Sequence, residues 1–195
     1  MDSSMRYGYD TVHFNTEPRG TNAFVEVQVQ HWVMLVERVV EAVGPHRLVG
    51  RVVQGFQRGS KQLGWPTANL DPAAFEHKLD AATEGVYIGW AAIVSPTLPE
   101  KDVGVHKAIL SIGWNPHFDD VKQRTVEAYI AHDFGGDFYD QEMRLMICAF
   151  IRPQAKFESF QALIDAISGD VEFGKNALDK PEILSLRADQ MFSST

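Results

Sequence analysis

After residue 46, hydrophobic and polar side chains alternate along several short segments, a period of two that is typical of β-strands. Residues 85–94 and 142–151 show this pattern, and residues 105–113 and 124–132 are also strand-like. The side chains expected on one face of the first segment are Val86, Ile88, Trp90 and Ala92. Those expected together on one face of the second are Met143, Leu145, Ile147, Ala149 and Ile151. Strands at short separations without intervening helices predict a closed or nearly closed antiparallel barrel.

A helical period precedes these segments. Apolar residues recur at steps of three and four, at Val25, Val29, Trp32, Val36, Val39 and Val43. This spacing predicts one face of a helix over residues 25–43 that stops at Gly44-Pro45. Valine favours strands, but the length of the segment and the Gly-Pro stop favour a helix. We expect it to pack on the barrel or on a second copy, with docking of a partner as the alternative.

A second helical pattern follows the strands, with Phe160, Leu163, Ile164 and Ile167 on one face. The pair Ser168-Gly169 interrupts it, and Asp170 is placed to cap a further helical stretch through Leu178. We expect these C-terminal helices to cover one mouth of the barrel.

Length and composition set the number of domains. With 195 residues, of which 45% are hydrophobic, the chain can bury one sizeable core. We therefore expect an N-terminal extension over residues 1–45 and one barrel domain over residues 46–195.

The sequence also bears on the cellular compartment. The lone cysteine, Cys148, has no partner for an internal disulfide and reads as a small buried hydrophobe. No stretch approaches the roughly 20 apolar residues of a membrane span, and the first residues do not resemble a secretory leader. We expect a monomeric cytoplasmic protein that binds neither membrane nor nucleic acid.

Residues 50–70 concentrate features that suit a phosphate ligand. The chain has 26 acidic and 18 basic residues, yet residues 46–70 contain four bases and no acid: Arg47, Arg51, Arg58 and Lys61. Gly55, Gly59 and Gly64 allow backbone amides to approach phosphate oxygens, and Lys61 adds a point charge. A local positive segment in an acidic protein suits a nucleotide triphosphate better than a long nucleic acid. A solvated surface loop is the alternative for the glycines alone.

The same segment contains candidate metal ligands. Pro66 favours an extended chain, in which Thr67 and Asn69 project to one side. A hydroxyl and an amide oxygen suit Mg²⁺, which takes its remaining ligands from water and substrate phosphates. Neither G-x-x-x-x-G-K-[ST] nor G-x-G-x-x-G occurs, so the common phosphate-binding folds are disfavoured.

On the strand over residues 124–132, Glu127 is the one carboxylate. Val126 and Ala128 face the other way, so Glu127 shares a side with Thr125 and Tyr129 and can accept a hydrogen bond from a substrate hydroxyl. A cross-strand ion pair with Arg144 or Lys107 is the alternative role.

These motifs together resemble the riboflavin kinases, in particular the single-function eukaryotic type. Residues 50–69 match G-x-V-V-x-G-x-x-R-G-S-K-x-L-G-x-P-T-A-N. Further matches follow in order, at G-V-Y-I-G-W-A, S-I-G-W-N-P, T-V-E, D-F-Y and F-I-R-P-x-x-K-F. The resemblance spans the last three quarters of the chain and implies a six-stranded antiparallel, Greek-key-like barrel.

The resemblance implies that ATP phosphorylates riboflavin at its 5′-hydroxyl, giving FMN and ADP, with Glu127 as the catalytic group. It also implies a nucleotide site and a metal site at Thr67 and Asn69 for Mg²⁺, with Zn²⁺ or Mn²⁺ as alternatives. The residues expected at the nucleotide are Gly55, Arg58, Lys61, Thr67, Ile130, His132 and Tyr139. Arg152 and Phe157 would bind the flavin, since they supply a cation and an aromatic surface.

Other assignments remain open. His132 alone reads as an ordinary histidine at a strand end. Asp133-Phe134-Gly135 spells a protein-kinase tripeptide, but the other motifs of that fold are absent. A barrel that holds FMN as a redox cofactor would leave Thr67 and Asn69 without a task. An inert barrel with a partner-docking helix is the third hypothesis. No nucleotidyltransferase portion is visible, so FAD synthesis is not expected.

Overall fold

The computed structural model describes residues 12–13, 26–27, 36–55, 64–114 and 124–193. The chain divides into two compact units, residues 1–37 and residues 38–195. In the first unit, β1 (Val12–His13) and β2 (Glu26–Val27) pair antiparallel, with Val12 opposite Val27. The second unit contains all the other elements and is the one that carries the candidate chemistry.

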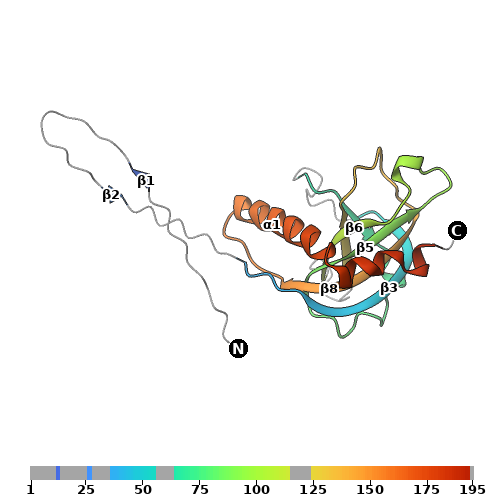
Figure 1. Ribbon diagram of the computed structural model, residues 1–195, viewed down its shortest axis with the longest axis horizontal. Coiled ribbons are helices and arrows are strands. Elements are labelled where there is room, and N and C mark those ends of the chain that lie inside the picture. The colour runs from blue at the N-terminus through green and yellow to red at the C-terminus, as the bar shows by residue number, and fades with distance from the viewer. Residues whose placement is uncertain (1–11, 14–25, 28–35, 56–63, 115–123, 194–195) are drawn as a thin grey trace, which may run out of the picture. The chain divides into compact units, whose positions relative to one another are not determined.

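The second unit is built on six antiparallel strands that close into a barrel (Figure 1). The strands are β3 (Glu41–Val53), β4 (Thr67–Leu70), β5 (Gly85–Val94), β6 (His106–Trp114), β7 (Arg124–Ile130) and β8 (Glu142–Pro153). Around the ring the order is β3-β4-β7-β6-β5-β8, and β8 pairs with β3 to close it. The connections from β4 to β5 and from β7 to β8 join strands that are not neighbours. The predicted six-stranded barrel is therefore confirmed.

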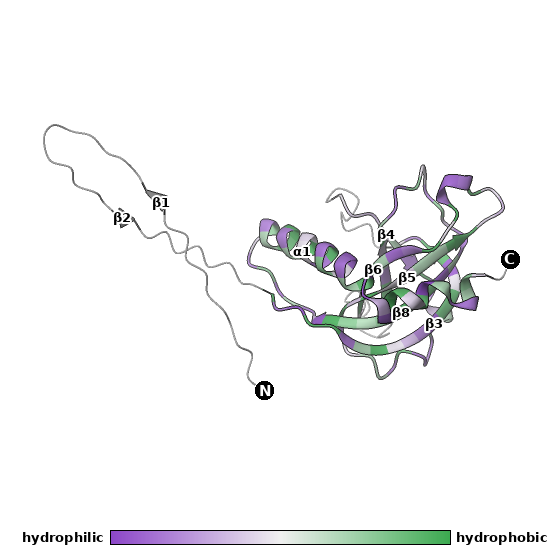
Figure 2. Cartoon of the chain, in the orientation of Figure 1, coloured by the Kyte–Doolittle hydropathy of each residue, from purple (hydrophilic) through white to green (hydrophobic). Residues whose placement is uncertain are grey.

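The barrel has hydrophobic layers on both sides of its wall. The interior cluster includes Leu48, Tyr87 and Leu110, and an outer cluster includes Ile88, Trp90 and Ile109. Strand β5 contributes to both, so nearly all of its residues are buried. Figure 2 shows hydrophobic residues along the barrel strands and a mixed pattern along the C-terminal helix. This double burial explains why β5 contains apolar residues at successive positions.

Strand β8 contains two irregularities in its pairing with β5, one between Ile88 and Gly89 and one between Val86 and Tyr87. Each adds a residue to β8 and shifts the alternation of side chains, as β-bulges do. Met143, Leu145 and Ile147 share one face as predicted, the interior one, whereas Ala149 and Ile151 belong to the outer cluster. The prediction that all five share one face is therefore wrong after Ile147.

Cys148 lies in this irregular part of β8 and is 4% exposed. Burial raises the pKa of its thiol to about 12. The expectation of a buried, hydrophobic cysteine is confirmed.

Helix α1 (Phe160–Leu178) lies against the outer surface of the barrel, and its Val171, Ala177 and Leu178 join the outer cluster. The hydroxyl of Ser159 caps the helix by accepting a hydrogen bond from the amide of Ala162. The predicted position over a barrel mouth is wrong. In the described part of the chain, the turn η1 (Pro72–Ala74) and the residues after it pack against the interior cluster through Ala74, Phe75 and Leu79.

The predicted break in this helix is also wrong, because α1 continues through Ser168, Gly169 and Asp170. Gly169 leaves room for the guanidinium of Arg38, whose Nη2 would lie 2.6 Å from a Cβ at this position. Asp170 is buried inside the helix and is not a cap. The small residues that looked like a helix stop are thus explained by a close contact between the helix and the segment before β3.

The chain ends in short elements beyond α1, namely α2 (Pro181–Leu184), η3 (Ser185–Ala188) and η4 (Gln190–Phe192). Trp90 on β5 donates from Nε1 to the carbonyl of Ile183, at 3.1 Å. The remaining turn, η2 (Glu100–Asp102), precedes β6.

The helix predicted over residues 25–43 is wrong where the structure describes it. Residues 36–40 have no regular secondary structure, and residues 41–43 belong to β3, where Glu41 pairs with Phe150. Valine's preference for strands prevails because β8 offers a pairing edge. Gly44 and Pro45 lie within β3, at a shift in its register with β8. The predicted boundary between residues 45 and 46 falls inside this strand, and residues 28–35 lie outside the described residues.

Candidate active site

Three adjacent strands present polar side chains in a row on the outside of the barrel. Asn69 on β4 pairs directly with Glu127 on β7, and Glu127 pairs with Ser111 on β6. Thr67 pairs with Tyr129 one step along, and burial raises the pKa of the Tyr129 phenol. Side chains directly opposite in an antiparallel pair lie with Cβ atoms about 5 Å apart. The metal-ligand candidates and the candidate catalytic carboxylate are therefore neighbours.

The orientation of this row follows from burial on the same strands. Val126 and Ala128 on β7 are each 1% exposed and belong to the interior cluster, as does Ala68 on β4. Alternation then turns Glu127, Thr67 and Asn69 outward. The predicted common side of Thr67 and Asn69, and the predicted direction of Glu127, are confirmed.

Gly55, at the start of the glycine-rich segment, lies against this row. The amide of Asn69 occupies the space that a Cβ at Gly55 would need, so only glycine brings the backbone this close to Asn69. Gly64 has φ of 87°, a left-handed conformation that favours glycine. Arg58, Gly59 and Lys61 lie outside the described residues.

The bases that were alternative partners for Glu127 have other acidic neighbours. Arg144 donates from Nε to Glu142, at 2.8 Å, and from Nη1 to the carbonyl of Met191. Lys107 donates to Asp179 at the end of α1, at 2.6 Å. The cross-strand ion pair of Glu127 with either base stays an alternative prediction.

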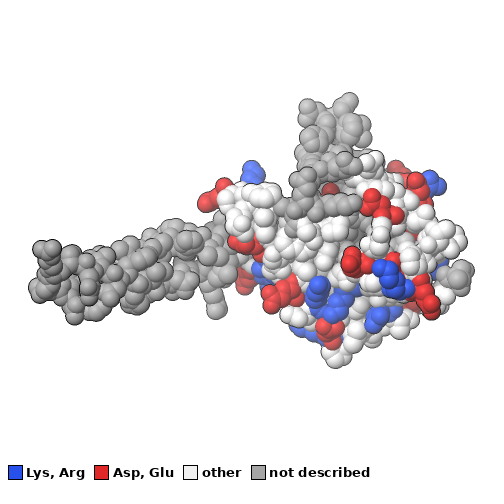
Figure 3. Space-filling model, turned by 90° about the horizontal axis from the view of Figure 1, so that it is seen from above, with Lys and Arg blue, Asp and Glu red and all other residues white. Residues whose placement is uncertain are grey.

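Two of the four bases counted in residues 46–70 pair with acids from distant segments. Arg47 donates to Asp189, at 2.6 Å from Nη2, and this bond lowers the pKa of Asp189. Arg51 lies 3.8 Å from Asp140, with both side chains exposed. On the face seen in Figure 3, Lys and Arg atoms lie beside Asp and Glu atoms. The positive segment in the sequence is thus partly neutralised in space.

The residues expected at the nucleotide are in different environments. Ile130 is 4% exposed and belongs to the interior cluster, so its side chain faces the core, and its place at the nucleotide stays a prediction. Tyr139 is 45% exposed. His132, just after β7, donates from Nε2 to Asp102 and stacks on His106. His132 at the end of β7 is therefore held in place by a hydrogen bond and a ring contact.

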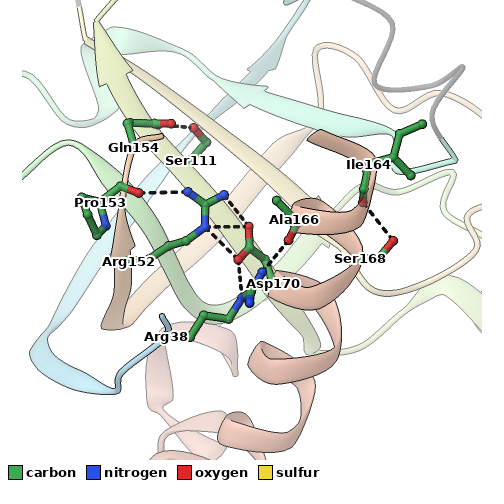
Figure 4. Close-up of polar contacts among 9 residues, drawn as sticks. All are labelled: Arg38, Ser111, Arg152, Pro153, Gln154, Ile164, Ala166, Ser168 and Asp170. Atoms are coloured by element: carbon green, nitrogen blue, oxygen red, sulfur yellow. Dashed lines mark hydrogen bonds and ion pairs between the residues drawn. The ribbon is translucent and has the colours of Figure 1, made fainter. Parts of the chain in front are cut away.

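The residues expected at the flavin lie where β8 leads into α1. Arg152 is 4% exposed, and its guanidinium binds Asp170 through three hydrogen bonds of 2.6 to 3.0 Å (Figure 4). Arg38 binds the same carboxylate from Nε, at 2.7 Å. Arg152 also lies over the ring of Phe157, at 5.9 Å from its centroid. The structure therefore gives Arg152 a role in joining strand and helix, while its contact with flavin stays a prediction.

Sequence reasoning gave no role to Ser111, which belongs to the row, or to Gln154, which contacts it. Gln154, two residues after Arg152, donates from Nε2 to the hydroxyl of Ser111, at 2.9 Å. Ser111 pairs with Glu127, so this amide lies next to the candidate catalytic carboxylate. Both residues fall within matched motifs, at S-I-G-W-N-P and R-P-x-x-K-F, and only the pairing of β6 with β7 makes them neighbours.

Comparison with known proteins agrees with this geometry. The flavokinase model, described as riboflavin kinase, matches residues 43–178. The chain belongs to the riboflavin kinase family. The mouse riboflavin kinase is 43% identical over 143 residues, which cover 73% of this chain and 87% of the relative. The predicted resemblance is confirmed, and it supports ATP-dependent phosphorylation of riboflavin to FMN.

Two further relatives bear on the extent of the riboflavin kinase domain. The bifunctional riboflavin kinase/FMN phosphatase of Arabidopsis thaliana is 38% identical over 173 residues, and the match covers 86% of this chain but 43% of that protein. The crystal structure of riboflavin kinase from Trypanosoma brucei superposes with a TM-score of 0.61 at 32% identity. That match covers 78% of this chain and 91% of the other. Within the described residues, no helix has both the length and the apolar character needed to cross a membrane.

Proposed function

We propose that this chain is an ATP:riboflavin 5′-phosphotransferase, with Glu127 as the group that orients the attacking hydroxyl and accepts its proton. The hydroxyl oxygen forms a bond to the γ-phosphorus, the bond from that phosphorus to the bridging oxygen of ADP breaks, and the products are FMN and ADP. Phosphoryl transfer needs alignment and charge neutralisation more than covalent chemistry from the protein. A carboxylate that is paired across the strands with an asparagine and a serine fits this need.

The observation that carries the proposal is the direct pairing of Glu127 with Asn69 on one side and with Ser111 on the other. It brings a proton acceptor beside an amide oxygen and, one step along, the hydroxyl of Thr67.

Thr67 and Asn69 are the residues that would hold a divalent cation. Their neutral oxygens fit an ion that takes its other ligands from water and phosphates, and the close approach of Gly55 to Asn69 limits how the amide can turn. When bound, Mg²⁺ would supply positive charge to the phosphate oxygens of ATP. Zn²⁺ and Mn²⁺ are alternatives.

The flavin would lie on the opposite side of Glu127 from the metal ligands, toward β6 and the junction of β8 with α1. Phe157 offers an aromatic surface there, and Gln154 and Ser111 offer polar atoms. Arg152 would act on the flavin mainly by holding Phe157 and the junction in place, because its guanidinium is committed to Asp170.

The test is incubation of the protein with ATP, Mg²⁺ and riboflavin, followed by chromatography for FMN. Glu127→Gln should slow turnover by about two to four decades while ATP and riboflavin still bind, because it removes a positioned acid–base group. Glu172→Gln, at an exposed site on α1, is the matched control and should retain full turnover. Near-normal turnover in Glu127→Gln would refute the role assigned to this carboxylate, and absence of FMN with the wild-type protein would refute the function.

A further inference from the structure

A buried carboxylate outside the row, Asp102, contacts two histidines at the end of the barrel where β6 begins and β7 ends. Asp102 is 1% exposed at the end of η2. Its Oδ1 lies 2.8 Å from Nε2 of His132. Its main-chain oxygen lies 3.2 Å from Nε2 of His106. Lys101 is 3.8 Å from the same Oδ1.

These contacts determine which ring nitrogen of each histidine carries a proton. The bond from His132 lowers the pKa of Asp102, so the carboxyl is ionised and can only accept hydrogen bonds. Nε2 of His132 must therefore be the donor. A carbonyl oxygen also only accepts, so Nε2 of His106 is a donor as well. In both rings these two contacts use Nε2, and Nδ1 takes part in neither of them.

Aromatic contacts hold the plane of the His132 ring. His106 stacks on it with ring centroids 4.1 Å apart and an angle of 23°. Phe134 meets it edge-on at 4.7 Å, and Phe134 in turn packs against Phe138. The His132 side chain is 23% exposed, so part of a ring fixed by three neighbours still reaches the surface.

We propose that Asp102 is a positioning residue for the nucleotide site, which holds His132 with Nε2 protonated and so presents Nδ1 as an acceptor. The ligand group it would receive is a hydrogen-bond donor of the nucleoside, either the exocyclic amine of adenine or a ribose hydroxyl. This inference rests on the proposed function, in which His132 borders the nucleotide. It goes further by naming the residue that fixes the state of the histidine and the kind of ligand atom it reads.

A buried hydrogen bond between a carboxylate and a histidine can also be purely structural, and steady-state kinetics separates the two roles. Asp102→Ala removes the carboxylate but keeps the main-chain oxygen that His106 uses. We expect the KM for ATP to rise about 5-fold, the change that corresponds to one lost hydrogen bond. The KM for riboflavin and kcat should stay within about 2-fold of the wild type, as expected for a residue that acts on nucleotide binding alone.

Asp102→Asn is the conservative variant, because its amide oxygen can still accept a hydrogen bond from Nε2 of His132. Its KM for ATP should lie between that of the wild type and that of Asp102→Ala. Asp80→Asn is the matched control: it changes the carboxylate of an exposed pair, where Asp80 lies 3.3 Å from His77, and should leave every constant unchanged. Unfolding temperatures measured for each variant show whether it is folded under assay conditions. If Asp102→Ala is not folded, Asp102→Asn decides the test.

Two substrate analogues identify the donor. Inosine triphosphate lacks the exocyclic amine, and 2′-deoxy-ATP lacks one ribose hydroxyl. For the analogue that lacks the relevant donor, the wild type and Asp102→Ala should have the same KM. For the other analogue, the KM of Asp102→Ala should be raised as much as it is for ATP. If Asp102→Ala raises the KM for both analogues as much as it raises the KM for ATP, the hydrogen bond belongs to the remaining ribose hydroxyl.

Nitrogen NMR of the histidine rings tests the inference independently of activity. In the ligand-free wild type, His132 should show a protonated Nε2, and in Asp102→Ala this preference should be lost. An unchanged tautomer, or an unchanged KM for ATP in a folded Asp102→Ala, would overturn the inference. Failure of the proposed function is distinct, because the wild type would then make no FMN while the tautomer of His132 would still depend on Asp102.

Discussion

The buried cluster of Asp170 with Arg152 and Arg38 makes the most demanding prediction about stability. Arg152 on β8 and Asp170 on α1 each have 4% of the side chain exposed, and Arg38 has 16%. Arg38 also donates to the carbonyl of Ala166, at 2.8 Å. One carboxylate therefore compensates two guanidinium groups at the point where the strand, the helix and the segment before β3 meet (Figure 4).

The perturbation is Asp170→Asn, which keeps the shape of the side chain and removes its charge. Breaking a buried ion pair by changing one partner costs about 3 to 5 kcal/mol, because the remaining charge is left uncompensated. We expect about 3 kcal/mol here, the lower end, because the amide oxygen still accepts one hydrogen bond. For a unit of this size, that loss corresponds to a decrease of about 9 °C in the unfolding temperature.

The assay is urea unfolding followed by circular dichroism. With a slope of about 2 kcal/mol per molar urea, the midpoint should fall by about 1.5 M. The control is Asp165→Asn on the same helix, where an exposed carboxylate accepts a hydrogen bond from Gln161, and its midpoint should move by less than about 0.3 M. A shift as small as the control's in Asp170→Asn would refute the reasoning, because it would mean that the two arginines find other compensation.

Two further predictions concern the site and its surroundings. Gly55→Ala should lower the rate of FMN formation at least about 10-fold, because a Cβ there needs the space of the Asn69 amide; unchanged activity would show that this approach is not needed in the working enzyme. Acid should destabilise the protein in two steps, since burial lowers the pKa of His106 below 6.5 and the bond from His132 lowers that of Asp102 below 3.8. In both cases the folded state binds the proton more weakly than the unfolded state. The stabilising contribution of each group is therefore fully present above its ordinary pKa, and it is lost as the pH falls through the lowered pKa of the folded state. Urea midpoints between pH 7.5 and 5 should therefore decrease for the wild type and less for His106→Gln, and equal decreases would contradict the role given to His106.

The directions of Thr67, Asn69 and Glu127 could be predicted because each depends on a period of two alone. Val126 and Ala128 are apolar and therefore buried, which sends Glu127 outward without knowledge of any partner strand. Which residue lies opposite Glu127 could not be predicted. The pairing with Asn69 and Ser111 depends on the register of three strands, of which β4 and β7 lie far apart in the sequence.

The errors have the same origin. Ala149 and Ile151 face the outer layer because pairing with β5 introduces irregularities into β8, and no pattern within β8 reveals them. Arg47 counted as a free positive charge because its partner, Asp189, is 142 residues away in the sequence. Gly169 suggested a helix stop because the guanidinium that occupies its space belongs to Arg38. Local patterns predict local structure, and these features are determined by contacts between distant segments.

The chemistry of the candidate site then depends on residues that take no part in it. A slip of one residue between β4 and β7 would exchange the two faces of the shorter strand, turning Thr67 and Asn69 into the core and Ala68 out. The interior cluster opposes such a slip, because it contains Ala68 and Leu70 from β4 beside Val126 and Ala128 from β7. Putting Thr67 and Asn69 there would bury a hydroxyl and an amide among apolar side chains, at a cost of about 1 to 3 kcal/mol for each polar group left without a partner. The alternation of small apolar residues in the barrel core is therefore what holds the candidate metal ligands beside Glu127.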